Sequence, residues 1–195
     1  MNIPPRLSIE LVNDSPREQA AREGLLNLMK TYDLSRWQYT NRIRISENEI
    51  PHSHPILTLN GHDGFAHPLR LLSSFLHEQL HWFWLLAEHG DSLSAARAEL
   101  GMAFPNLPLD PPAGCGDEDS NYLHIPINYW ELDGLASLLG VEPARAFIAR
   151  KPYYQAIYQL VLNHTDQVGD LLANHWLLVP ERPPEKLQFL ETIDD

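Results

Sequence analysis

The sequence predicts an α+β fold: a helix-rich single domain spanning 1–195, with a small antiparallel or mixed sheet over a buried helix. Two observations lead to this class. Apolar residues recur at helical spacing over 16–32 and 67–88, which indicates two long helices. Between them, shorter apolar segments over 37–47 and 54–60 favour strands. A chain of 195 residues is long enough to bury one substantial core.

Composition and charge limit the classes of partner. Apolar residues make up 44% of the chain and charged residues 21%, which is typical of a globular protein. The formal net charge is −12 and no basic stripe is present, so we expect neither nucleic acid nor a membrane surface as a partner. No segment holds the roughly 18 apolar residues of a transmembrane helix. The N-terminus lacks a secretory signal and Cys115 is the single cysteine, which together predict a cytoplasmic protein of unspecified oligomeric state.

The first long helix has a well-marked start. Ser15 can cap it, Pro16 suits its first position, and Glu18 completes a capping box. Turn and breaker residues divide the second half of the chain into shorter elements. The predicted elements are a helix over 92–100 ending at Gly101, a loop over 105–120, a short strand or irregular segment over 122–127, a helix over 129–139, a short helix from 142, a helical stretch over 152–176 bent near Gly169, and a Pro-rich tail from about 180.

One motif carries chemistry: His77-Glu78-Gln79-Leu80-His81 matches H-E-x-x-H. Residues four apart share one face of a helix, so both imidazoles can reach the same metal ion. Glu78 follows His77 and can take a proton from a metal-bound water. The spacing therefore predicts a zinc site with His77 and His81 as ligands and Glu78 as general base.

The flanks of the motif strengthen this prediction. The helix is apolar on most of its circumference, which indicates burial. Buried histidines need polar partners, and one metal ion satisfies both imidazoles at once. The alternative is a pair of core histidines bonded to backbone carbonyls, with Glu78 at the surface.

The chain resembles the zincin metallopeptidases and, more narrowly, small bacterial HExxH proteins. The resemblance is carried by His77-Glu78-Gln79-Leu80-His81-Trp82, Tyr122-Leu123-His124 and Trp130-Glu131-Leu132. It implies a zinc-dependent hydrolase whose sheet lies above the active-site helix. It also implies that the edge strand, His54 to Asn60 here, pairs with an extended peptide substrate by strand addition.

The resemblance is narrower than a full family pattern. Trp84 and Ala87 stand where metzincins have glycine and a third histidine, so that subclass is excluded. Gluzincins take a third ligand from a glutamate in E-x-x-x-D. Glu131 fits that glutamate, whereas Leu135 stands in the place of the aspartate.

Two residues compete for the third metal ligand. Glu131 lies in an apolar helical segment, where a carboxylate is easier to explain beside a cation. His124 lies seven residues earlier and could be the ligand or an outer partner. The sequence slightly favours Glu131 and leaves His124 open, with His164 next. Tyr154 is a candidate donor to the oxyanion that develops during hydrolysis.

These residues predict a zinc-dependent hydrolase, most simply a metallopeptidase that acts on a peptide or protein. A second reading keeps the fold but not the reaction, as a catalytically inactive zincin-like protein that binds metal or a partner. A third reading is a helical interaction module without a metal. Replacing Glu78 separates the first two readings.

Overall fold

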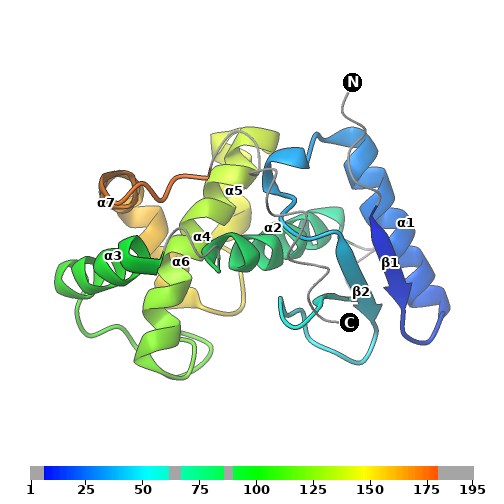
Figure 1. Cartoon of the computed structure of the whole chain (residues 1–195), viewed down its shortest axis with the longest axis horizontal. Helices are drawn as coiled ribbons and strands as arrows, with labels where there is room; N and C mark the ends of the chain where they lie inside the picture. The colour runs from blue at the N-terminus through cyan, green and yellow to red at the C-terminus, as the bar shows by residue number, and fades with distance from the viewer. Residues whose placement is uncertain (1–6, 62–66, 86–89, 180–195) are drawn as a thin grey trace. The chain divides into compact units, whose positions relative to one another are not determined.

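The computed structural model describes residues 7–61, 67–85 and 90–179 (Figure 1). These residues fall into two compact units, one within Met1–Phe83 and the other spanning Trp84–Val179. The single domain indicated by the sequence stays a prediction, and the tail from about 180 lies outside the described residues.

The first unit combines a small sheet with two long helices. Its elements are β1 (Ser8–Leu11), α1 (Pro16–Thr31), a 3-10 turn η1 (Ser35–Trp37), β2 (Arg42–Ser46), β3 (Leu57–Asn60) and α2 (Pro68–Trp84). Helix α1 packs on β1 and β2 (Figure 1). The predicted helices over 16–32 and 67–88 are confirmed as α1 and α2, although residues 86–89 lie outside the described chain.

The sheet differs from the prediction in strand direction. Its order is β1-β2-β3 and both pairings are parallel, so the expected antiparallel or mixed sheet is wrong. Parallel neighbours need a crossover connection, and α1 supplies it between β1 and β2. Strand β1 has four residues, and its alternation is too short to indicate a strand on its own.

The start of α1 follows its sequence signals. The Ser15 hydroxyl accepts a hydrogen bond from the Glu18 backbone N–H, and Pro16 occupies the first turn. The buried Glu18 carboxylate accepts from the backbone N–H groups of Asn13 and Glu47. Burial alone would raise the pKa of Glu18, but these hydrogen bonds outweigh burial and lower it.

Helix α2 is buried along most of its length, as its apolar circumference predicts: every residue from Leu71 to Leu80 is buried. Gln79, inside the HExxH motif, fixes the helix to the chain just before β2. Its side-chain oxygen accepts from the N–H groups of Tyr39 and Thr40 at 2.7 and 2.8 Å, and its amide donates to the Thr40 carbonyl at 3.0 Å. These hydrogen bonds, made by a residue of the motif, therefore fix the rotation of α2 about its axis.

Gln79→Ala is expected to lower the free energy of unfolding by about 2–4 kcal/mol, because two buried N–H groups lose their acceptor. Urea denaturation of the two proteins measures the difference. Gln19→Ala is the matched control, since Gln19 makes its side-chain hydrogen bonds to Asp14 at the surface. Equal losses in both variants would show that the buried hydrogen bonds of Gln79 stabilise the fold no more than the exposed ones of Gln19.

The second unit is helical in its described residues. Its helices are α3 (Gly90–Ala103), α4 (Glu118–Leu139), α5 (Val141–Ile148), α6 (Gln155–Asn163) and α7 (Thr165–Asn174). Helix α4 contacts each of the other four.

Helix α4 overturns one prediction. Its N-terminus is capped by Asp117, whose carboxylate accepts from the Ser120 N–H, and it runs through Pro126 to Leu139. The short strand or irregular segment expected over 122–127 is therefore wrong. Proline removes one intrahelical hydrogen bond, but burial of α4 on most faces offsets that loss.

Two glycines act differently from their predicted roles. Gly101 lies inside α3, which continues to Ala103. The bend predicted near Gly169 occurs instead at His164, between α6 and α7. Gly169 serves packing, because a Cβ atom there would lie 2.5 Å from the Tyr129 hydroxyl oxygen.

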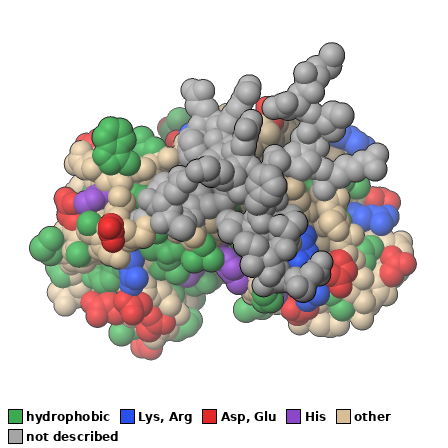
Figure 2. Space-filling view, viewed as in Figure 1, with side chains coloured by type: hydrophobic (Ala, Val, Ile, Leu, Met, Phe, Trp, Pro, Cys, Tyr) green, Lys and Arg blue, Asp and Glu red, His purple; other side chains and the backbone are tan. Residues whose placement is uncertain are grey.

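Among the described helices, none combines the length and the apolar character that crossing a membrane requires. On the face drawn in Figure 2, acidic side chains gather in several groups, while Lys and Arg are scattered among them.

Candidate metal centre

In the first unit, the two motif histidines face each other on α2. Their Nε2 atoms lie 3.3 Å apart, and the ring centroids are 5.0 Å apart. His77 and Glu78 are buried, and His81 is half-buried. The predicted convergence of His77 and His81 on one face of the helix is therefore present.

The separation of the two nitrogens suits a shared metal ion. Zinc bonds to imidazole nitrogen at about 2.0–2.1 Å, and two such bonds at a tetrahedral angle place the nitrogens about 3.3 Å apart. His77 and His81 show that separation between their Nε2 atoms. The distance between the two Nε2 atoms is therefore compatible with a shared zinc ion.

The helix that carries the pair is also anchored near the motif's end. The Trp82 indole N–H donates to the Ser53 carbonyl at 3.0 Å, and the His54 ring stacks on Trp82 with centroids 4.4 Å apart. Contacts of Gln79 and Trp82 therefore hold the middle of the motif and the residue that follows it within the first unit.

Strand β3 lies at the edge of the described sheet, as the resemblance implies for the strand over 54–60. Part of that edge is already paired within the chain. Thr58 exchanges both backbone hydrogen bonds with His52, at 2.8 and 3.1 Å. A peptide could therefore not pair with Thr58 by strand addition unless it displaced His52.

In the second unit, His124 lies near the N-terminal end of α4 and is buried. Its Nδ1 atom lies 2.7 Å from the Ser120 carbonyl oxygen. A carbonyl can only accept, so Nδ1 carries a proton and, in the neutral ring, Nε2 carries the lone pair. Metal-binding histidines are typically oriented in this way.

Tyr154, the predicted oxyanion donor, packs against His124. The two ring centroids are 4.5 Å apart. Tyr154 has φ 52°, a left-handed conformation that is unusual for a residue other than glycine. Such conformations persist only where surrounding contacts enforce them, and they are frequent at functional sites.

Glu131, the ligand that the sequence slightly favoured, has other partners. Its Oε1 atom lies 2.5 Å from the Lys151 Nζ atom, and its Oε2 atom accepts from the Tyr158 hydroxyl at 2.7 Å. Burial alone would lower the pKa of Lys151, but the Glu131 carboxylate raises it overall. A cation of the chain itself therefore compensates the buried carboxylate. The apolar surroundings of Glu131 gave no sign of Lys151, which lies twenty residues later.

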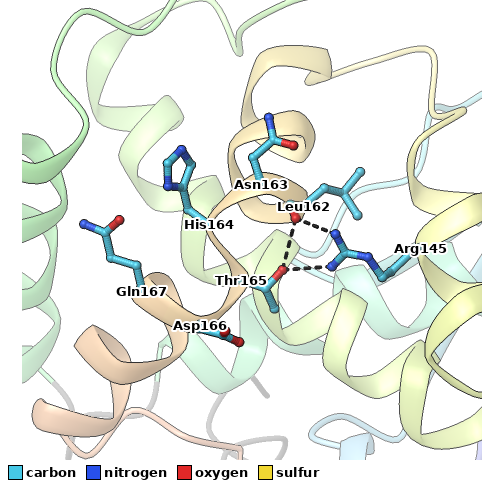
Figure 3. Close-up of a pocket in the computed structure, with 7 residues that line it drawn as sticks. All are labelled: Arg145, Leu162, Asn163, His164, Thr165, Asp166 and Gln167. Atoms are coloured by element: carbon cyan, nitrogen blue, oxygen red, sulfur yellow. Dashed lines mark hydrogen bonds between the residues drawn. The ribbon is translucent and has the colours of Figure 1, made fainter.

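His164, the next choice for a ligand, lines a pocket where α6 meets α7 (Figure 3). Arg145 occupies this junction and donates to the Leu162 carbonyl and the Thr165 hydroxyl. The His164 ring packs against Phe104, with centroids 5.2 Å apart. In the part of the chain that the structure describes, His164 belongs to no group of side chains that could hold a metal ion.

Asn128 is a polar residue that the sequence prediction missed. It lies between His124 and Glu131 on one face of α4, at helical spacing. It is fully buried, and both polar atoms of its amide are without a hydrogen-bond partner among the described residues. The expected strand at Pro126 concealed this spacing, which a continuous helix makes evident.

Asn128→Leu is expected to keep or raise the free energy of unfolding by up to about 1 kcal/mol, because an unsatisfied buried amide is removed. Asn121→Leu on the same helix should instead cost about 1–3 kcal/mol, since Asn121 bonds the Cys115 N–H and the Pro108 carbonyl. Thermal and urea unfolding compare the two. A large loss in Asn128→Leu would mean that an ordered water satisfies the amide.

Comparison with known proteins adds no relative, since no family model, no curated protein and no solved structure matches the chain. The function has to be inferred from the residues of the chain itself.

Proposed function

We propose that the protein is a zinc-dependent hydrolase, most simply a cytoplasmic zincin-like peptidase, with His77, His81 and His124 as zinc ligands. The observation that carries the proposal is the 3.3 Å separation of the His77 and His81 Nε2 atoms, which suits two bonds to one zinc ion. Glu78 follows the first of these histidines, at the position of the general base in this motif.

The third zinc ligand is proposed to be His124 rather than Glu131. Catalytic zinc sites usually have three protein ligands and keep one position for water. We propose His124 as the third of these ligands, as one of the two candidates that the sequence offers. The Ser120 carbonyl leaves the His124 Nε2 atom with its lone pair, whereas both oxygens of Glu131 are occupied by hydrogen bonds within the second unit.

In the proposed reaction, each side chain has a separate task. When bound, zinc supplies the positive charge that lowers the pKa of a water molecule and polarises the substrate carbonyl. Glu78 takes the proton from the attacking water and passes it to the leaving amine. The Tyr154 hydroxyl donates a hydrogen bond to the carbonyl oxygen as negative charge develops on it.

The decisive experiment is Glu78→Gln. This variant should bind zinc as the parent does but hydrolyse peptides about 10²–10⁴-fold more slowly, because the amide cannot accept the proton. Zinc content is measured by elemental analysis and hydrolysis with a fluorescence-quenched peptide library. Glu23→Gln, at an exposed position of α1, is the control for loss of one carboxylate.

The outcomes separate the two readings of the sequence. If the parent protein binds one zinc ion per chain but cleaves no peptide, the non-catalytic metal- or partner-binding protein is favoured. If it takes up no transition metal at neutral pH, the zinc hydrolase and the metal-binding protein are both wrong, and an interaction protein without a metal is favoured.

A further inference from the structure

The buried ion pair between Glu131 and Lys151 joins the helix that carries His124 to the segment that carries Tyr154. We propose that this pair, closed by Tyr158, is a clamp that positions the Tyr154 ring against His124. Only the effect of the clamp on catalysis rests on the proposed function. The contact between the Tyr154 and His124 rings involves neither zinc nor substrate, so it can be tested without them.

The clamp is a closed ring of hydrogen bonds. The Lys151 Nζ atom donates to Glu131 Oε1 and, at 3.0 Å, to the Tyr158 hydroxyl oxygen, while that hydroxyl donates to Glu131 Oε2 at 2.7 Å. The ammonium also lies 5.2 Å from the centre of the Tyr153 ring. All three members of the ring are buried, so water does not compete for these bonds.

The clamp can position Tyr154 because its residues lie on both sides of Tyr154 in the sequence. Glu131 follows His124 by seven residues, which places both on one face of α4, two turns apart. Lys151 precedes Tyr154 by three residues, and Tyr158 follows it by four. The segment bearing Tyr154 is therefore tied to the His124 face of α4 on both sides of the tyrosine.

A second attachment fixes the start of α6. The backbone N–H groups of Gln155 and Ala156 donate to the carbonyls of Pro112 and Ala113, at 2.9 and 3.0 Å. Between this attachment and Lys151, Tyr154 is held in its left-handed conformation with its ring 4.5 Å from that of His124. Several independent contacts thus enforce a backbone conformation that a tyrosine rarely adopts.

Stability alone does not account for the pair. Burying two charges carries a large desolvation cost, and apolar side chains of similar size often replace such a pair without loss. Apolar replacements would fill the same volume, but they would lack directional hydrogen bonds. A lysine that must meet one carboxylate and one hydroxyl fixes the path of its chain more narrowly than apolar packing does.

The test removes the polar atoms and keeps the volume, in the triple variant Glu131→Met/Lys151→Met/Tyr158→Phe. The ring proton resonances of His124, read by NMR in zinc-free protein, should shift towards those of Tyr154→Ala, in which the neighbouring ring is absent. With zinc bound, kcat for the peptide library should fall by about 10–100-fold while KM and zinc stoichiometry stay near those of the parent.

The control is Glu99→Ala/His175→Ala, which removes a different hydrogen-bonded pair of side chains in the same unit and should leave the His124 resonances unchanged. A folded triple variant with unshifted His124 resonances would overturn the clamp. If the triple variant does not fold, Tyr158→Phe replaces it, because that variant loses two hydrogen bonds and keeps the ion pair. It should shift the same resonances less far, and an unchanged spectrum again rejects the clamp.

Failure of the clamp and failure of the proposed function remain distinguishable. The NMR comparison needs no zinc and no turnover, so it decides the clamp even if the parent protein proves inactive. Conversely, zinc binding and Glu78-dependent hydrolysis with unshifted His124 resonances would support the proposed function and reject the clamp.

Discussion

Replacing His77, His81 or His124 by alanine is expected to weaken zinc binding by more than 100-fold. Loss of an outer partner of a ligand costs about 10–100-fold, and loss of a ligand costs more. Competition with a chromophoric chelator measures the zinc affinity of each variant. Glu131→Gln, in contrast, should bind zinc with an affinity within about 100-fold of the parent, because its carboxylate is taken up by Lys151 and Tyr158.

Two further measurements control this experiment. His175→Ala removes a histidine that pairs with Glu99 at the surface and should leave zinc affinity unchanged. Thermal melting of the parent with and without chelator shows whether zinc stabilises the fold, as binding to the native state requires. A larger loss of affinity in Glu131→Gln than in His124→Ala would identify Glu131 as the ligand.

Local signals in the sequence predicted the parts of the molecule that depend on neighbours in the chain. Ser15 and Pro16 mark the start of α1, and the spacing of His77 and His81 predicts that their nitrogens converge. Each of these features needs only one turn of helix, and helical geometry fixes what four residues of separation mean. The burial of α2 followed in the same way from its apolar circumference.

The errors concern partners that are distant in sequence. The direction of β2 and β3 depends on how the connections cross the sheet, which alternation does not specify. Pro126 is unfavourable inside a helix, but the loss is offset by packing that brings other helices onto α4. Local propensity therefore misplaced the start of the helix that carries His124.

Glu131 illustrates the same limit at the level of the site. A buried carboxylate requires a positive partner, and the sequence suggested a metal for this role because a metal was already expected. The partner in the structure is Lys151, which the turn after α5 brings back to α4. A cation does compensate the buried carboxylate, but its identity depends on tertiary structure.

Lys151→Met is expected to lower the free energy of unfolding by about 3–5 kcal/mol, because it leaves the Glu131 carboxylate buried without its cation. The double variant Glu131→Met/Lys151→Met should recover much of that loss, since neither charge then remains in the interior. Urea denaturation at neutral pH, with comparable m-values for all three proteins, gives the differences. Arg97→Met is the control, because it breaks the exposed ion pair with Asp119 and should cost at most about 1 kcal/mol.

The pH dependence of stability gives an independent check on the same pair. The pKa of Lys151 is raised in the folded protein, where burial opposes the shift and the Glu131 carboxylate produces it. A raised pKa contributes stability that is fully present below the pKa of the unfolded lysine and is lost as pH rises through the folded value. The parent should therefore lose stability at strongly alkaline pH, and the double variant should lack this component of the loss. Identical alkaline profiles in the two proteins would show that the pair adds no stability as an ion pair.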